Sequence, residues 1–90
     1  MQAQPRPEIT IYSTQVCPYC VAAKRLLQQK GIPFKEVDLS NDDSLRQKLS
    51  QENQGWRTVP MIFIGSEFVG GYTELAGLDK RGELDKKLHA

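Results

Sequence analysis

The 90-residue sequence contains few of the side chains that hold metal ions in proteins. It has two cysteines and one histidine, and that histidine, His89, is the penultimate residue. A structural zinc site needs four ligands, and no second cysteine pair is present to complete one. We therefore expect no zinc site within one chain, and no tightly bound metal or other cofactor.

The sequence also lacks an excess of charge and long apolar stretches. Twelve basic and 11 acidic residues leave a formal net charge of +1, whereas a nucleic-acid-binding surface needs a clustered basic excess. The longest apolar stretch, residues 59–64, is too short to cross a bilayer. Residues 1–7 lack the apolar core of a secretory signal. We expect no nucleic-acid partner, no membrane association and a cytoplasmic location.

The length and organisation of the chain predict one domain over residues 1–90. No internal repeat, low-complexity segment or linker divides it. Pro5 and Pro7 make residues 1–7 an extended, loose lead-in. We expect the protein to be a monomer.

The pattern of apolar residues predicts an α/β protein with the order βαβαββα. Ile9 and Ile11 share one face of a strand over residues 8–12, and a helix over about 18–30 ends at Gly31. With a strand over 34–39, these elements make a right-handed βαβ unit. A second helix is predicted to begin within 40–43 and to end by 55. Strands over 61–64 and 67–69 follow, joined by a turn at 65–66. The chain then forms a helix capped by Thr73 that runs to about 81, and a last amphipathic turn or two around Leu84 and Leu88.

The two cysteines stand two residues apart, where the first strand leads into the first helix. The first turn of a helix has N–H groups without intrahelical partners and a partial positive charge. A thiolate is stabilised there, so the pKa of its thiol falls from about 8.5 to about 3.5–7.5. Pro18 suits the first helical position. A structural disulfide is the alternative, but so small a loop constrains the unfolded chain little. We predict Cys17 as nucleophile and Cys20 as resolving thiol.

Three motifs follow one another along the chain: Cys17-Pro18-Tyr19-Cys20, Thr58-Val59-Pro60 and Gly70-Gly71-Tyr72-Thr73. In this order and spacing they resemble the glutaredoxin family, specifically its small bacterial-type dithiol members. The resemblance extends from about residue 8 to residue 88. It implies a thioredoxin fold, with a four-stranded mixed sheet flanked by helices. It also implies glutathione as electron donor, and glutathionylated and disulfide-containing proteins as partners.

The resemblance further implies where glutathione binds. In the family the Val-Pro bond is cis, which would turn the Val59 backbone toward Cys17 to pair with an extended peptide. Glycines before a helix start allow a ligand close approach, and the free N–H groups there bind a carboxylate. The predicted glutathione-binding residues are Tyr19, Arg57, Thr58, Val59, Pro60, Gly71, Tyr72, Thr73 and Glu74.

Some assignments within this set depend on departures from the family pattern. Thr14 stands where many relatives carry a lysine, so Arg57 is our candidate for binding the glycyl carboxylate, with Gln54 as the alternative. Glu74 stands where the family often has Asp, and its longer side chain is the candidate for the γ-glutamyl ammonium. We interpret Trp56 as a partly exposed loop residue.

The predicted function is that of a glutathione-dependent thiol–disulfide oxidoreductase. Glutathione mixed disulfides would need Cys17 alone, whereas protein disulfides would need both cysteines. One alternative is a redoxin recharged by thioredoxin reductase, against which Arg57 and the motif at residues 70–73 argue. A second alternative is an iron–sulfur carrier that binds its cluster through Cys17 and glutathione, against which Pro18 argues.

Overall fold

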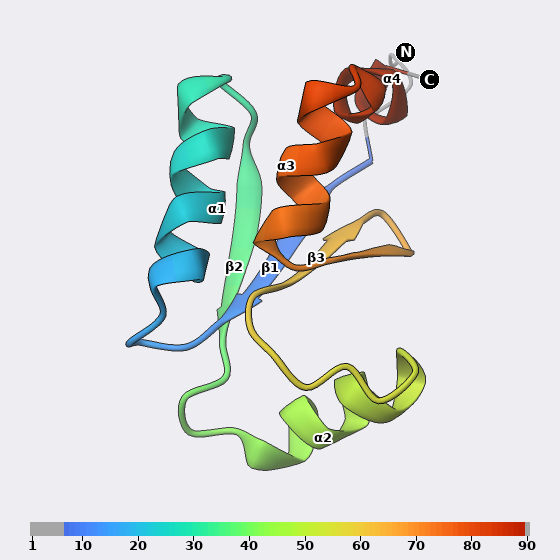
Figure 1. Cartoon of the computed structure of the whole chain (residues 1–90). Helices are drawn as coiled ribbons and strands as arrows, with labels where there is room; N and C mark the ends of the chain where they lie inside the picture. Colours follow the sequence, from blue (N-terminus) through green and yellow to red (C-terminus); the bar gives the residue numbers. More distant parts are fainter. Residues whose placement is uncertain (1–6, 90) are drawn as a thin grey trace, which may run out of the picture.

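Four strands form one mixed sheet in the computed structural model, which describes residues 7–89 (Figure 1). The strands are β1 (Ile9–Ser13), β2 (Phe34–Asp38), β3 (Met61–Ile64) and β4 (Glu67–Gly70). β1 pairs in parallel with β2 and antiparallel with β3, and β3 pairs antiparallel with β4. The order across the sheet is β2-β1-β3-β4. The predicted four-stranded mixed sheet is confirmed.

Helices flank this sheet in the predicted chain order. They are α1 (Pro18–Gln29), α2 (Asp43–Glu52), α3 (Tyr72–Lys80) and α4 (Glu83–His89). The amphipathic turns expected near the end of the chain form α4, a short helix of their own. The lead-in predicted over residues 1–7 lies, apart from Pro7, outside the described residues.

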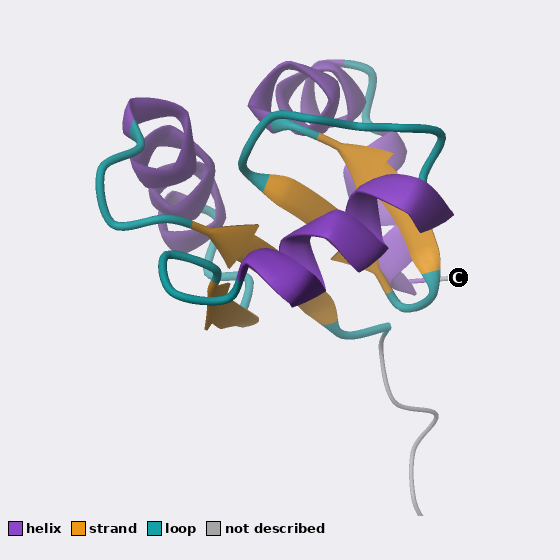
Figure 2. Cartoon of the chain, turned by 90° about the horizontal axis from the view of Figure 1, so that it is seen from below, coloured by secondary structure: helices purple, strands orange, loops and turns teal. Residues whose placement is uncertain are grey.

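Two clusters of apolar side chains form on opposite faces of the sheet, because successive residues of a strand point to opposite sides. Ile9 and Ile11 face the large core, which α1, α3 and α4 cover, whereas Tyr12 faces the small core under α2. Figure 1 shows α1 and α3 side by side with α2 apart from them, and Figure 2 shows α2 crossing the strands from below. The large core consists of Ile9, Ile11, Ala23, Leu27, Ile32, Ile62, Ile64, Leu75, Leu78, Leu84 and Leu88. The small core has Leu39, Leu49 and Met61 at its centre.

The chain after the hairpin differs from the prediction in two respects. β4 continues one residue further than expected, because Gly70 pairs with Ile62 across an irregularity in the register. The predicted cap at Thr73 is wrong, because α3 begins at Tyr72 and Gly71 is its N-cap. The Gly71 N–H donates instead to Glu74 Oε1, at 2.9 Å. The glutamate in the first turn of α3 thus provides the acceptor for the Gly71 N–H, an interaction that the pattern of apolar residues does not predict.

The far end of α1 is tied to the two C-terminal helices. Lys30, at the C-cap of α1, places its Nζ 2.6 Å from Asp79 Oδ1 in α3 and 3.8 Å from Asp85 Oδ2 in α4. The hydrogen bond that Lys30 donates to Asp79 is the largest of the effects that raise the pKa of Lys30. The end of α1 that carries the cysteines lies at the opposite tip of the helix.

Candidate active site

The cysteine pair occupies the start of α1, directly after the loop that leaves β1. Cys17 is the N-cap residue, with an extended backbone, and Pro18 is the first helical residue. The Cys20 N–H donates to Cys17 Sγ at 3.0 Å. The two cysteines form a disulfide, with their Cα atoms 5.2 Å apart. Cys17 is 8% exposed and Cys20 only 1%, so an outside reactant reaches Cys17 first.

The Val59 backbone approaches the cysteine pair from the loop before β3. Cys17 Sγ lies 3.7 Å from the Val59 carbonyl oxygen. In the disulfide the sulfur carries no hydrogen, so this distance is a contact and not a hydrogen bond. The Val59–Pro60 bond is cis, as the family resemblance implied.

A pocket of about 330 Å³ opens beside the cysteine pair. Its walls come from the start of α1, the loop before β3 and the start of α3. It brings together every predicted glutathione-binding residue except Arg57, and it adds Trp56. The lining residues are Tyr19, Trp56, Thr58, Val59, Pro60, Gly71, Tyr72, Thr73 and Glu74.

The start of α3 supplies backbone donors to this pocket. The first N–H groups of a helix have no intrahelical acceptor, and the Gly71 N–H already donates to Glu74. The N–H groups of Tyr72 and Thr73 come next in the first turn. The Tyr72 ring stacks on that of Tyr19, with centroids 6.4 Å apart. The pocket therefore joins an aromatic wall to a helix N-terminus, an arrangement that suits an extended ligand with a carboxylate at one end.

Trp56 is a pocket residue that the sequence interpretation missed. Its ring meets Phe68 edge to face, with centroids 5.2 Å apart, as part of the small core. A Cβ atom on Gly71 would lie 3.7 Å from Trp56 Cζ2, so the indole stands close behind the N-cap of α3. Its Nε1 is buried and has no hydrogen-bond acceptor among the described residues. The only signal in the sequence was a lone tryptophan just before the Thr58-Val59-Pro60 motif.

Arg57 lies outside this pocket. It is exposed and lines a neighbouring pocket of about 410 Å³. Its carbonyl oxygen accepts a hydrogen bond from Arg46 Nη2 at 3.2 Å. Gln54, the alternative candidate, is exposed and has a positive φ of 65°. The neighbouring pocket is lined by Asp43, Arg46, Gln47, Ser50, Trp56 and Arg57. Trp56 belongs to both pockets, and binding of the glycyl carboxylate by Arg57 stays a prediction.

A polar network supports the cysteine helix from the side of β2. Glu36 Oε2 accepts hydrogen bonds from Lys24 Nζ at 2.8 Å and from Ser13 Oγ at 2.7 Å. These two bonds, that from Lys24 foremost, lower the pKa of Glu36. Ser13 is buried, so its hydroxyl needs this acceptor. The network connects three elements: α1, β2 and the end of β1. It therefore lies beside the loop that leads from β1 to Cys17.

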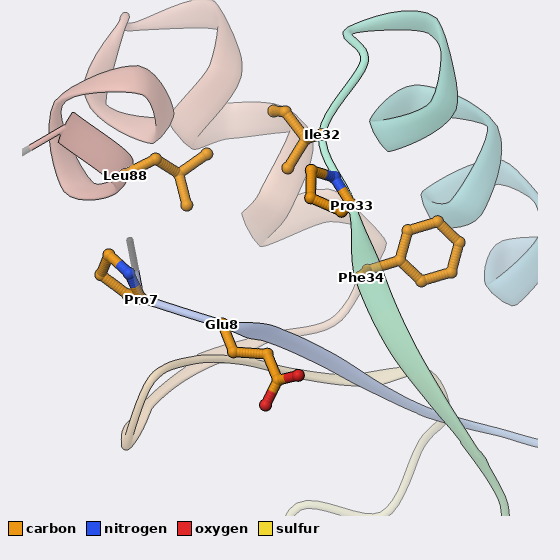
Figure 3. A pocket seen from close by; sticks show the side chains of 6 residues that line it. All are labelled: Pro7, Glu8, Ile32, Pro33, Phe34 and Leu88. Carbon is orange, nitrogen blue, oxygen red and sulfur yellow. The ribbon is translucent and has the colours of Figure 1, made fainter. Parts of the chain in front are cut away.

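A further pocket of about 270 Å³ lies at the other end of β1. It is bounded by Pro7, Ile32, Pro33, Phe34 and Leu88 together with Glu8. Figure 3 shows the carboxylate of Glu8 pointing away from the side chains of Ile32 and Leu88. This pocket lies away from the loop that joins β1 to Cys17, whereas the pocket beside Tyr19 adjoins the start of α1.

Neither a cluster of metal ligands nor a membrane-spanning helix occurs among residues 7–89. Within this range no three side chains of histidine, cysteine, aspartate or glutamate come together as a metal site would require. No described helix has both the length and the apolar composition needed to cross a membrane.

Comparison with known proteins gives one family. The model of the glutaredoxin family matches residues 9–69. A glutaredoxin of Pseudomonas aeruginosa is 44% identical over 84 residues, which cover 93% of this chain and 99% of that protein. The solution structure of a Brucella melitensis glutaredoxin is 41% identical and superimposes with a TM-score of 0.84, covering 97% of this chain and 94% of that one. The crystal structure of a buckwheat glutaredoxin–glutathione complex is 29% identical, with a TM-score of 0.86, over 92% of this chain and 77% of that one.

Proposed function

The chain belongs to the glutaredoxin family and is a thiol–disulfide oxidoreductase, and from that premise we propose that glutathione is its electron donor. One observation carries the proposal: the pocket that touches the cysteine helix also contains the Val59 backbone and the N-terminus of α3. Glutathione has a sulfur, an extended peptide backbone and a γ-glutamyl carboxylate, one group for each of these three features.

In this proposal Cys17 alone reduces glutathione mixed disulfides. The Cys17 thiolate attacks the glutathione sulfur, a bond forms between these two sulfurs, and the protein thiolate leaves and takes up a proton. A second glutathione thiolate then attacks the glutathione sulfur bound to Cys17. Glutathione disulfide leaves, and Cys17 returns to its thiolate form. The 8% exposure of Cys17 supports this role, since both attacks need access to a sulfur from outside.

Protein disulfides follow a second route that uses both cysteines. Cys17 attacks one sulfur of the substrate and forms a mixed disulfide with it. Cys20, one turn further along α1, then attacks Cys17 Sγ and releases the reduced substrate. The Cys17–Cys20 disulfide in the structure corresponds to the product of this step. Two glutathione molecules then reduce this disulfide to two thiols and leave as one molecule of glutathione disulfide.

The residues around the pocket take the following proposed roles. The Val59 N–H and C=O pair with the cysteinyl backbone of glutathione, and the N–H groups of Tyr72 and Thr73 bind its γ-glutamyl carboxylate. Glu74 lies close to the γ-glutamyl ammonium, and Tyr19 covers the ligand. Thr58, Pro60 and Gly71 shape the walls. Arg57 binds the glycyl carboxylate from the neighbouring pocket.

The test is steady-state turnover of a small glutathione mixed disulfide, with glutathione as reductant and glutathione reductase as the coupling enzyme. We expect turnover that saturates with the mixed disulfide. Turnover only when thioredoxin reductase replaces glutathione and glutathione reductase would overturn the proposal in favour of a thioredoxin-reductase-linked redoxin. A visible absorbance band after anaerobic purification would instead favour an iron–sulfur carrier. We further propose a monomer that works in a reducing compartment such as the cytoplasm, where thiols stay reduced.

A further inference from the structure

Three large apolar side chains are exposed in the part of the chain that the structure describes, and all three adjoin the cysteines. Val16 is 92% exposed, Tyr19 64% and Val21 49%. All three fall within residues 16–21. Single apolar residues scattered over a surface need no explanation, but each of these three stands directly next to a cysteine in the chain. We call Val16, Tyr19 and Val21 the apolar rim.

Two members of the apolar rim occupy positions that usually shield each other. Cys17 is the N-cap of α1, so Val16 stands at N′ and Val21 at N4, the two positions of a hydrophobic staple. A closed staple would bury both side chains, whereas here one is almost fully exposed and the other about half. The packing of α1 therefore does not account for an apolar residue at position 16.

The apolar rim carries no charge of its own. The first turn of α1 has no acidic residue. The first basic residue along the helix, Lys24, is held 2.8 Å from Glu36 in an ion pair on the β2 side. A charged partner would gain little from this surface, whereas an apolar partner would remove apolar area from water on both sides.

The exchange reaction brings a polypeptide against this surface. When Cys17 attacks a glutathione sulfur, the leaving sulfur lies beyond it, roughly two S–S bonds of about 2.05 Å each from Cys17 Sγ. The residues next to the substrate cysteine must then lie against whatever surrounds Cys17. On the side of Tyr72 this is the ligand pocket, and around the start of α1 it is the apolar rim.

We propose that the apolar rim is the docking surface for the polypeptide that carries the substrate cysteine. It selects mixed disulfides whose protein side has apolar residues next to that cysteine. This inference rests on the proposed function and adds a substrate preference to it. The chemistry is unchanged: the bond between Cys17 and the glutathione sulfur forms, the bond to the partner's sulfur breaks, and the partner leaves as a thiolate that is then protonated.

The test uses two glutathionylated ten-residue peptides that differ only at the two residues on each side of the cysteine, leucine in one and serine in the other. For the wild-type protein we expect kcat/KM to favour the leucine peptide. In the double variant Val16→Thr, Val21→Thr, which keeps side-chain shape but replaces a methyl group with a hydroxyl at each position, this preference should fall about tenfold. Gln28→Thr, an exposed position in the last turn of α1, is the matched control and should keep the wild-type preference.

Failure of this inference and failure of the proposed function give different results. If the wild-type protein turns over a small glutathione mixed disulfide but does not distinguish the two peptides, or if the double variant keeps the preference, the docking role is wrong. If the wild-type protein turns over no glutathione substrate at all, the proposed function fails. Docking is then decided by NMR titration with the leucine peptide carrying serine in place of cysteine. Amide shifts confined to residues 16–21 support the inference, and shifts elsewhere or none overturn it.

Discussion

Cys17 Sγ lies 3.7 Å from the carbonyl oxygen of Val59, although the two residues are 42 positions apart in the sequence. The contact joins the start of α1 to the loop before β3, at the corner of the pocket where we propose that the sulfur and the backbone of glutathione bind. Substitutions can test the two parts separately, because the cysteines carry the thiol chemistry and the pocket residues carry the proposed ligand binding.

The two cysteines should respond differently to substitution. Cys20 is 1% exposed and Cys17 8%, and only Cys17 is needed when glutathione resolves the intermediate. Cys20→Ser should retain much of the activity on glutathione mixed disulfides and lose most activity on protein disulfides. Cys17→Ser should abolish both, because a serine hydroxyl is hardly ionised near neutral pH. Two turnover assays on three proteins measure this. Equal loss in both variants on a glutathione mixed disulfide would rule out the route that uses Cys17 alone.

The reduced Cys17 thiol should react at a lower pH than an ordinary thiol. It is the N-cap of α1, and the Cys20 N–H points at its sulfur from 3.0 Å, so its thiolate form is stabilised by a backbone donor and by the helix dipole. The measurement is the rate of alkylation by iodoacetamide between pH 4 and 9 in the Cys20→Ser variant, with free glutathione as the control thiol. A pH profile that coincides with that of glutathione would contradict the assigned geometry.

Glu74 can be tested for two roles at once. Its Oε1 accepts from the Gly71 N–H at 2.9 Å, and we propose that its charge also attracts the γ-glutamyl ammonium. Glu74→Gln keeps an acceptor for the cap, so unfolding in urea should change by less than about 0.5 kcal/mol, whereas Glu74→Ala should cost about 1 kcal/mol. Both variants should raise KM for glutathione several-fold. If KM is unchanged in Glu74→Gln, the Glu74 carboxylate has no role in binding the ammonium, and its only role is to accept the hydrogen bond from Gly71.

Trp56 should report the occupation of the pocket by its fluorescence. It is the only tryptophan in the chain and lines the pocket beside Tyr19. In the Cys20→Ser variant, attachment of glutathione to Cys17 should shift or quench the emission, because the ligand changes the surroundings of the indole. The same protein alkylated with iodoacetamide, which adds only a small group, is the control. Identical spectra for the two adducts would place the bound glutathione away from Trp56.

The ion pair between Lys24 and Glu36 should make stability depend on pH. The pKa of Glu36 is lowered from 4.5, chiefly by its hydrogen bond from Lys24, so its contribution is present above the unfolded-state pKa and is lost as pH falls through the folded-state value. The Glu36 side chain is 40% exposed, so Glu36→Gln should cost no more than about 1 kcal/mol at pH 7. The difference from wild type should vanish in acid. Urea unfolding at several pH values measures it, and Lys24→Gln should show the same trend if the pair is the cause.

The order of strands and helices could be predicted from the sequence, because the residues that the apolar pattern places on the inner faces are the ones that are buried in the structure. Ile9 and Ile11 lie in the large core, whereas Tyr12 packs against the small core on the opposite face of the sheet. Gly31, predicted to end the first helix, has a positive φ of 69° just after α1. Local patterns of this kind need no knowledge of distant residues.

The parts that could not be predicted depend on contacts between segments or on side-chain choices that an apolar pattern does not encode. Gly70 reads as a strand breaker, but its pairing with Ile62 keeps it in β4. The sequence predicts Thr73 as the cap of the third helix. The structure has Glu74 reaching back to accept from the Gly71 N–H, and α3 begins earlier, at Tyr72. Trp56 is the partly exposed loop residue that the sequence predicts, but its place in the pocket depends on contacts with Phe68 and near Gly71, which come from later in the chain.

The placement of the site between the two cores has a consequence for how such a protein diverges. Cys17 caps the helix that the large core holds and Cys20 lies in its first turn, whereas Trp56 and Val59 pack with the small core. Substitutions in the small core therefore act on the pocket walls at Trp56 and Val59. Substitutions in the large core act on the start of α1 and, through Tyr72 and Leu75, on the start of α3 as well. A lineage can thus reshape one wall of the pocket through the residues under α2 while the helix that carries the cysteines keeps its packing.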